Sequence, residues 1–325
     1  MSNENSLFVC MTPLQMKIAE RIICEKKIID YKVICLFLAK SEKYVYYFDK
    51  IKKNSRDSFF YYPKEKAKGI SLLKDVYVYK RQLLKSEILV NVKNVYAASI
   101  DNRYVQLIAS TLKNTNFYTF DDGLANLNYK GSYHKDEILS KMKLFLWGII
   151  GVNFFAQNFR RKSKTHYSLY KNKKNIIDKV EYISLFDAVY QKKCNSDAEV
   201  NIFLGQPIHE VNKKADDDYV NAIIEKFNID TYFPHPRESY SINNKIEVIS
   251  SDLIFEDYVL KFYSDNLNIK KINIFTFFST AILNLENLDF VQCYAIYDIS
   301  YFDMGIYENF KNFNIEIISM ESFSK

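Results

Sequence analysis

Residues 232–240 read Tyr-Phe-Pro-His-Pro-Arg-Glu-Ser-Tyr, and they follow a short apolar run, 227–233, that is typical of a buried strand. The two prolines lack a backbone N–H and bias the residue before them to extended geometry, so neither a helix nor a strand ladder continues here. His235 is therefore expected on a stiffened turn at the carboxyl end of a strand, where open α/β sheets bind ligands. Arg237 adds a planar cation suited to a phosphate or a carboxylate. The alternative is a rigid surface turn whose histidine has no role.

Apolar runs alternate with helical patterns on both sides of this turn. In the C-terminal half we expect strands at residues 200–204, 229–233, 246–249, 272–275, 290–295 and 315–319, and helices at 216–227, at 255–263 and near Ser279. In the N-terminal half we expect strands at 7–10, 32–38, 58–62, 94–100 and 116–120, and helices from Thr12-Pro13, from Glu42, at 70–85 and at 103–112. Such alternation predicts parallel sheets with helices on both faces.

The sequence therefore predicts an α/β protein of two doubly wound, Rossmann-like domains that face each other across a cleft. The first domain is expected over residues 1–190 and the second over 196–325, since 325 residues are enough for two domains of ordinary size. The less regular middle, about 124–195, is interpreted as a helical and apolar insertion in the first domain.

Composition argues against several classes of protein. The chain is 48% hydrophobic and 26% charged, which is a globular composition. It has only seven glycines and neither a G-x-G-x-x-G nor a Walker pattern, which argues against a P-loop NTPase or a typical dinucleotide-binding enzyme. The formal charge of +6 does not by itself argue for nucleic acid. No apolar run reaches the roughly 18 residues of a membrane span.

The cysteines and the N-terminus favour the cytoplasm. The five cysteines form no C-x-x-C pair and lie mostly in apolar runs, which is typical of reduced, buried thiols. The polar N-terminus leads directly into the first expected strand, without the pattern of a signal peptide.

One apolar segment lies beside a basic cluster. Residues 144–155 read Leu-Phe-Leu-Trp-Gly-Ile-Ile-Gly-Val-Asn-Phe-Phe, and lysines and arginines follow between Arg160 and Lys174. An apolar segment with a tryptophan beside basic residues is typical of contact with a membrane surface. The alternative is a buried core helix followed by a solvated basic face.

Asp121-Asp122-Gly123 follows the expected strand 116–120. The glycine permits a positive φ, so the tripeptide fits a turn at the carboxyl end of a strand. Mutual repulsion of two adjacent carboxylates favours proton uptake by one of them, which suits a general base acting on an attacking hydroxyl. The alternative is an ordinary Asp-Gly turn. A metal site is not expected, because no further ligand lies at suitable spacing.

A second polar group follows the expected strand 200–204. Gly205 would let a ligand approach the backbone, and Gln206 follows it in a Gly-Gln-Pro turn. Glu210 comes shortly afterwards and is a second candidate for the general base. Asp216 and the acids after it fit a helix start better than a catalytic role.

Two helix starts offer contacts for a nucleotide. Phe278, Ser279 and Thr280 lie where a strand runs into a helix, and hydroxyls and free N–H groups there make an anion site. Ser279 is equally suited to be a plain N-cap. Glu256 opens another helix, where it could accept hydrogen bonds from a ribose or complement the helix dipole.

Together these motifs resemble glycosyltransferase family 52, whose best-known members are bacterial lipooligosaccharide sialyltransferases. The resemblance runs from about Phe8 to near the C-terminus. It rests on the order and spacing of residues 12–20 (Thr-Pro-Leu-Gln-Met-Lys-Ile-Ala-Glu), 120–123 (Phe-Asp-Asp-Gly), 204–207 (Leu-Gly-Gln-Pro), 234–237 (Pro-His-Pro-Arg) and 277–279 (Phe-Phe-Ser). The Asp-Asp-Gly and His-Pro motifs are also similar to motifs shared more broadly among bacterial sialyltransferases.

The resemblance implies a GT-B fold and a metal-independent, inverting transfer of sialic acid from CMP-sialic acid, without a cofactor. The acceptor is expected to be a terminal galactose of a lipooligosaccharide or capsular glycan. His235 is implied as general acid or electrostatic partner toward the leaving CMP, Ser279 and Thr280 as holding its phosphate, and Glu256 as binding its ribose. The remaining expected substrate contacts are Asp121, Gly123, Gly205, Gln206, Pro236, Arg237 and Phe278.

The resemblance also implies a homodimer, with domain swapping that brings residues 70–85 to the partner's site, and contact between the middle region and lipid. The expected location is therefore peripheral, at the inner face of the bacterial cytoplasmic membrane. Nucleic acid is not expected as a partner.

The sequence departs from the family at the position of the base. The family's proposed base is an aspartate directly after the Gly-x-Pro turn, where this chain has Ile208. Asp122 and Glu210 are therefore the leading candidates, with Asp216 third. From this sequence, a counterpart of the family's N-terminal membrane anchor is not expected. A UDP-sugar-dependent hexosyltransferase, or a non-catalytic glycan- or lipid-binding protein of the same fold, is the alternative function.

Overall fold

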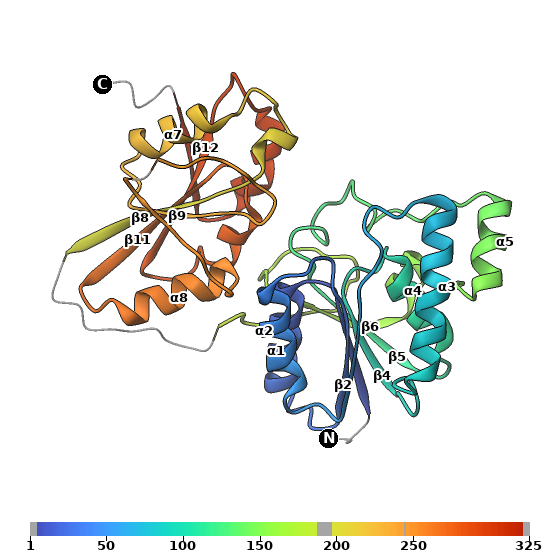
Figure 1. The fold of residues 1–325 in the computed structure, drawn as a ribbon. Helices are drawn as coiled ribbons and strands as arrows, with labels where there is room; N and C mark the ends of the chain where they lie inside the picture. Colours follow the sequence, from blue (N-terminus) through green and yellow to red (C-terminus); the bar gives the residue numbers. More distant parts are fainter. Residues whose placement is uncertain (1–4, 187–196, 244, 321–325) are drawn as a thin grey trace. The chain divides into compact units, whose positions relative to one another are not determined.

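The structure is a computed structural model that describes residues 5–186, 197–243 and 245–320. The chain divides into two compact units, Met1–Asp187 and Ala188–Lys325, and each is built on a parallel sheet with helices against it (Figure 1). The predicted end of the first domain, residue 190, and the predicted start of the second, residue 196, lie outside the described residues. The predicted α/β class is confirmed in both units.

The first unit has a seven-stranded sheet in the order β3-β2-β1-β4-β5-β6-β7, and all neighbouring strands are parallel. Its strands are β1 (Ser6–Cys10), β2 (Tyr31–Leu36), β3 (Asp57–Tyr61), β4 (Asn94–Ala97), β5 (Asn116–Phe120), β6 (Ser163–Ser168) and β7 (Val180–Tyr182). Its helices are α1 (Pro13–Glu25), α2 (Glu42–Lys52), α3 (Gly69–Lys85), α4 (Arg103–Thr111), α5 (Lys141–Ile150) and α6 (Ala156–Lys162). The winding direction reverses between β1 and β4, which makes this pair the switch point of the sheet.

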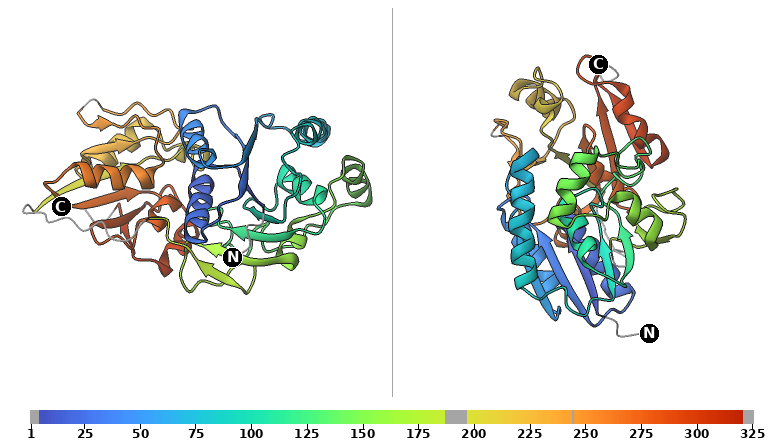
Figure 2. Two further views of the ribbon diagram at one scale, coloured as in Figure 1. Left: turned by 90° about the horizontal axis from the view of Figure 1, so that it is seen from below. Right: turned by 90° about the vertical axis from the view of Figure 1, so that its right-hand side faces the viewer.

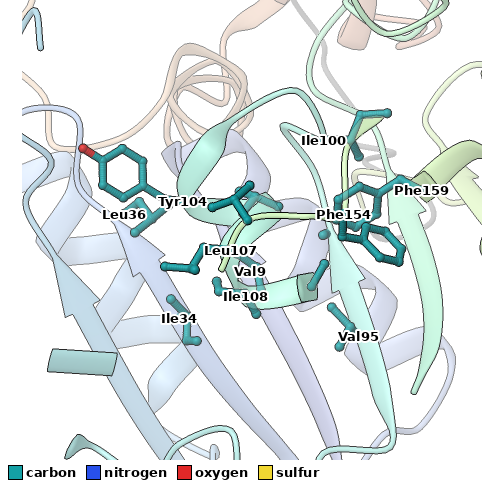
Figure 3. Packing of buried hydrophobic residues seen from close by; sticks show 14 of the residues in the cluster. Val9, Ile34, Leu36, Val95, Ile100, Tyr104, Leu107, Ile108, Phe154 and Phe159 are labelled. Carbon is teal, nitrogen blue, oxygen red and sulfur yellow. The ribbon is translucent and has the colours of Figure 1, made fainter. Parts of the chain in front are cut away.

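The core of the first unit consists of strand side chains that pack against the helices on the faces of the sheet. Successive side chains point to opposite faces, so every second residue of a strand meets the same layer of helices. On one face, strand residues pack against α4 and the segment after α5; Figure 3 shows Val9, Ile34, Leu36, Val95, Leu107, Ile108, Phe154 and Phe159 in this cluster. Helix α1 begins as predicted, because Thr12 Oγ1 accepts from the Gln15 N–H at 3.2 Å and Pro13 occupies the first turn.

The middle region differs from the predicted insertion. Residues 163–168 and 180–182 form β6 and β7, which extend the sheet beyond β5. No pattern in the sequence predicts β6, since Ser-Lys-Thr-His-Tyr-Ser has no apolar alternation. The strand is stabilised instead by buried polar contacts, and His166 is fully buried there.

The predicted apolar segment 144–155 divides between surface and core. Its first part lies in α5, which runs alongside α3 at the outer edge of the unit (Figures 1 and 2). Its second part is core, because Val152, Phe154 and Phe155 are buried. The basic cluster is also partly structural: Arg160 donates to the carbonyl oxygens of Tyr133 and Lys135 at 2.8 and 3.1 Å.

The second unit has a six-stranded parallel sheet in the order β10-β9-β8-β11-β12-β13. Its strands are β8 (Ala198–Leu204), β9 (Thr231–Phe233), β10 (Glu247–Val248), β11 (Ile269–Thr276), β12 (Val291–Tyr297) and β13 (Ile315–Ser319). Its helices are α7 (Asp217–Lys226) and α8 (Phe255–Asp265), and three 3₁₀ helices are η1 (Ile208–Glu210), η2 (Thr280–Asn284) and η3 (Met304–Asn312). The switch point here lies between β8 and β11.

The cysteines and the lengths of the helices bear on two further predictions. Cys10, Cys35 and Cys293 are buried free thiols as predicted, whereas Cys24 is exposed and Cys194 lies outside the described residues. Across the described ranges, no helix combines the length and apolarity that crossing a bilayer requires.

Candidate active site

Asp122 lies at the carboxyl edge of the first sheet and is held by three side chains. Gln15 Nε2 donates to its Oδ1 at 2.6 Å, while the hydroxyls of Ser99 and Tyr133 donate to its Oδ2 at 2.8 and 2.5 Å. Gln15 and Ser99 follow β1 and β4, so the carboxylate lies beside the switch point. Burial, and then the charge of Asp122, raise the pKa of Tyr133, which keeps this phenol a donor.

The support around Asp122 is itself fixed. Gln15 is buried, and its Oε1 accepts from the Met11 N–H at 2.6 Å, which orients its amide group toward the carboxylate. Ser99 has a φ of +49°, a left-handed conformation that is unusual for a residue with a side chain. Strained residues of this kind persist where surrounding contacts impose them, and they often occur at functional sites.

Asp121 has a different position from the one expected. Its side chain is fully buried, and its oxygens accept from His166 Nε2 at 2.9 Å, from the Ser168 hydroxyl at 2.8 Å and from the Leu169 N–H at 2.6 Å. These contacts join β5 to β6 and leave the carboxylate no exposed surface for a substrate. Gly123 adopts the predicted positive φ, +54°, in the turn that follows.

In the second unit, Gly205 does not leave open space for a ligand. A Cβ at this position would lie 2.5 Å from the Tyr232 hydroxyl oxygen and 2.6 Å from each carboxylate oxygen of Glu238. The room that the missing side chain creates is therefore already occupied by neighbouring side chains, which corrects the expectation of a direct ligand approach.

Gln206 connects the two strands at the second switch point. Its Oε1 accepts from the Phe278 N–H at 2.8 Å and lies 3.1 Å from the Thr276 hydroxyl. The side chain therefore orders the segment after β11, where Phe278 and Ser279 are half-buried and Thr280 is exposed. Ser279 caps η2, with its Oγ 3.4 Å from the Ala281 N–H. The expected helix here is only a five-residue 3₁₀ turn, so its dipole is small.

His235 lies directly after β9, on the predicted turn between two prolines. Its Nδ1 accepts from the Arg237 N–H at 3.1 Å. A nitrogen that accepts a hydrogen bond carries no proton, so the ring proton of the neutral imidazole is on Nε2. Pro236 is exposed at the same turn. The turn thus presents an imidazole with a defined tautomer at the edge of the sheet.

Two predicted site residues bind each other. Arg237 Nη1 donates to both carboxylate oxygens of Glu210, at 3.1 and 2.9 Å, and both side chains are exposed. The guanidinium expected to bind substrate and the carboxylate considered as base are therefore paired with each other. Glu256 is almost completely buried at the start of α8, and its Oε1 accepts from Asn284 Nδ2 at 2.8 Å.

The sequence did not single out several residues that complete these two sites. Two of them, Ser99 and Tyr133, lie outside the motifs. The other two, Tyr232 and Glu238, flank the Pro-His-Pro-Arg motif but belong to no pattern of their own. Only the adjacency of Glu238 to the His-Pro-Arg motif offered a signal. Among the residues that the structure describes, no group of three or more His, Cys, Asp or Glu side chains could hold a metal ion.

Comparison with known proteins identifies the family. The model of glycosyltransferase family 52 matches residues 31–298. The chain belongs to glycosyltransferase family 52. It is 31% identical over 87% of its length, and 87% of the relative's, to a CMP-N-acetylneuraminate:beta-galactoside alpha-2,3-sialyltransferase of Pasteurella multocida. It is also 31% identical over 97% of its length, and 86% of the relative's, to an N-acetyllactosaminide alpha-2,3-sialyltransferase of Neisseria meningitidis.

Solved structures of other enzymes share the fold. A putative UDP-N-acetylglucosamine 2-epimerase of Listeria monocytogenes superposes with a TM-score of 0.55 at 12% identity, covering 91% of this chain and 79% of that one. UGT71G1 of Medicago truncatula, in complex with UDP-glucose, gives a TM-score of 0.50 at 11% identity, with coverage of 91% and 81%. Identities this low show similarity of fold alone. The predicted GT-B fold of this glycosyltransferase is confirmed.

Proposed function

We propose that the chain is an inverting sialyltransferase that transfers sialic acid from CMP-sialic acid to a terminal galactose through an α-2,3 linkage. The observation that carries this proposal is an identity of 31–32% over 86–97% of the chain to three proteins named as alpha-2,3-sialyltransferases. The acceptor galactose is proposed to belong to a lipooligosaccharide or a capsular glycan.

In this reaction the acceptor oxygen bonds to the anomeric carbon of sialic acid as the bond from that carbon to the phosphate oxygen breaks. The electron pair of the broken bond leaves with CMP, and the hydroxyl proton passes to a carboxylate. Asp122 is the proposed base, because side chains from separate elements fix both of its oxygens. Glu210 is the alternative base, and it would first have to leave Arg237.

His235 is proposed to stabilise the leaving phosphate. With Nδ1 accepting from the turn, its Nε2–H is the group that can donate to a phosphate oxygen as charge develops there. Ser279 and Thr280 are proposed to hold the same phosphate, since both are accessible at the end of β11. From the family resemblance Glu256 is proposed to bind the ribose, for which its almost completely buried carboxylate would have to exchange Asn284 for a ribose hydroxyl.

Release of CMP from CMP-sialic acid, measured with and without lactose and in EDTA, tests the proposal. We expect release that the acceptor stimulates, and we expect His235→Ala to lower turnover about a hundredfold or more. An unchanged rate would remove His235 from the reaction. Activity with UDP-glucose in place of CMP-sialic acid would overturn the donor, and no turnover with any donor would favour a non-catalytic binding protein.

We further propose that α5 docks on the membrane surface, which would place the enzyme peripherally at the inner face of the cytoplasmic membrane. Met142, Phe145 and Ile149 lie on one side of α5 and are 70%, 68% and 66% exposed. Lys141 and Lys143 are exposed on the same helix and could bind anionic headgroups.

Flotation with vesicles of anionic phospholipid tests this contact. Phe145→Asp should reduce binding, because it places a charge on the apolar side of α5, and Ile29→Asp is a matched control at a site that is 76% exposed. Equal binding of both variants would contradict the proposal. A homodimer with the segment of α3 at the partner's site is proposed from the family resemblance, and the molar mass in solution, measured by light scattering, tests it.

A further inference from the structure

Glu238 connects the His235 turn to the end of the sheet. Its backbone N–H donates to the His235 carbonyl oxygen at 3.1 Å, which closes the turn. Its side chain returns toward β9, where Oε1 accepts from the Tyr232 hydroxyl at 2.8 Å. Tyr232 is only 1% exposed and stacks on Phe203, so it is a fixed anchor. The turn that carries the imidazole is therefore bonded to the sheet through one carboxyl group.

The same carboxyl group also contacts β8. Both of its oxygens would be 2.6 Å from a Cβ at Gly205, so they lie directly against the backbone of this glycine. Any larger residue at position 205 would displace them. Glu238 thus joins the ends of β8 and β9, the two strands from which Gln206 and His235 follow.

The environment of Glu238 favours its neutral form. Oε2 is buried and has no hydrogen-bond partner among the residues that the structure describes, and no ion pair joins the carboxylate to a cation within those ranges. The nearby Arg237 pairs with Glu210 instead. A buried, unpaired carboxylate oxygen is costly, whereas a neutral carboxyl group is tolerated more easily.

The pKa of Glu238 is raised accordingly. Burial raises its pKa from 4.5 to about 7, and the hydrogen bonds from Tyr232 and from the turn N–H oppose this only in part. Tyr240, which lies on the following segment, has a pKa raised first by burial and also by the charge of Glu238. The folded state binds the Glu238 proton more tightly than the unfolded state does. The stability that this protonation contributes is therefore fully present below about pH 4.5 and is lost as the pH rises through about 7.

We propose that Glu238 is a positioning residue that, in its neutral form, holds the His235 turn against the ends of β8 and β9. The inference rests on the proposed function, since His235 must act on the leaving phosphate for its position to matter in turnover. Loss of the Glu238 proton would expel the charged oxygen from its site against Gly205 and release the turn. Transfer activity should therefore decline at alkaline pH.

Two variants distinguish positioning of the His235 turn from a general effect on the stability of the fold. Glu238→Gln keeps a neutral hydrogen-bonding group of the same size, whereas Glu238→Ala removes every contact. We expect kcat of the wild type to fall about tenfold per pH unit above pH 7, and that of Glu238→Gln to stay level. Glu238→Ala should lower kcat at least about tenfold at every pH, with an unchanged KM for the acceptor. The inference would be overturned if kcat of wild type and of Glu238→Gln declined equally above pH 7, or if Glu238→Ala kept the full kcat.

A readout without substrate distinguishes this inference from the proposed function. The chain has only four histidines, so ¹⁵N-labelled histidine spectra are simple, and His235→Gln assigns the signal of interest. At pH 8 we expect the Nε2–H tautomer of His235 in Glu238→Gln and a mixture of tautomers in Glu238→Ala. The same His235 spectrum in both variants would contradict the inference. Absence of turnover with CMP-sialic acid would contradict the proposed function alone.

Discussion

Replacement of Gly205 by alanine is the perturbation that the structure constrains most closely. The new methyl group would lie 2.5 Å from the Tyr232 hydroxyl oxygen and 2.6 Å from both oxygens of Glu238, well inside van der Waals contact. All three atoms are side-chain ends, but Tyr232 is buried and its hydroxyl donates to Glu238, so the Glu238 carboxylate cannot move away without losing this hydrogen bond. Gly205 has no positive φ, so the effect should be steric alone.

The expected cost follows from two contributions. Overpacking of a closely packed site typically costs about 1–3 kcal/mol, and displacement of Glu238 would also remove a hydrogen bond worth about 1 kcal/mol. Together these give a loss of about 2–4 kcal/mol in the free energy of unfolding of the second unit. At about 3 °C per kcal/mol, the melting temperature of this unit should fall by about 6–12 °C.

Scanning calorimetry measures this change and can resolve the two units. Gly148→Ala is the matched control, because it lies within helix α5 and nothing apart from its chain neighbours and the helix's own backbone lies within 4 Å of the added methyl group. Alanine there should stabilise the first unit by about 0.5–1 kcal/mol. In a Glu238→Ala background, Gly205→Ala should cost less than in the wild type by about 1–2 kcal/mol, since two of the three close contacts are gone. If Gly205→Ala, like Gly148→Ala, did not lower the melting temperature of its unit, the steric reasoning would be refuted.

Three further outcomes are expected in the first unit. Asp122→Asn should lower kcat about a hundredfold in the CMP-release assay if it is the base, whereas the same loss in Glu210→Gln instead would transfer that role. Tyr133→Phe should lower kcat about tenfold, because Asp122 loses a donor worth about 1.5–3 kcal/mol, and wild-type kcat would exclude a supporting role. Asp121→Ala should reduce the unfolding free energy by about 3–5 kcal/mol, since it leaves His166 and its neighbours without their acceptor; calorimetry showing wild-type stability would disprove this.

Strand and helix positions could largely be predicted from the sequence. Residues 116–120 and 315–319 form strands with the predicted bounds, and most other elements end within a few residues of their expected limits. Apolar runs bounded by Gly, Pro and polar residues are local signals, and burial on both faces of a parallel sheet makes them continuous. The same local chemistry placed His235 at the end of a strand, because two prolines stop the ladder there.

What the sequence could not determine depends on contacts between distant residues. β6 is a strand although it has no apolar pattern, because its polar side chains bond to Asp121 across 45 positions of the chain. Asp121 and Asp122 are adjacent and chemically identical, yet one is fully buried and the other is only partly buried. The reason is that Asp121 bonds to β6 and the residue after it, whereas Asp122 bonds to Gln15 and Ser99 at the sheet edge. Only the fold brings Gly205, Tyr232 and Glu238 together. The sequence by itself determined which chemistry is available, and the tertiary structure decided which of these groups are buried, paired or accessible, because burial and pairing are properties of neighbours in space.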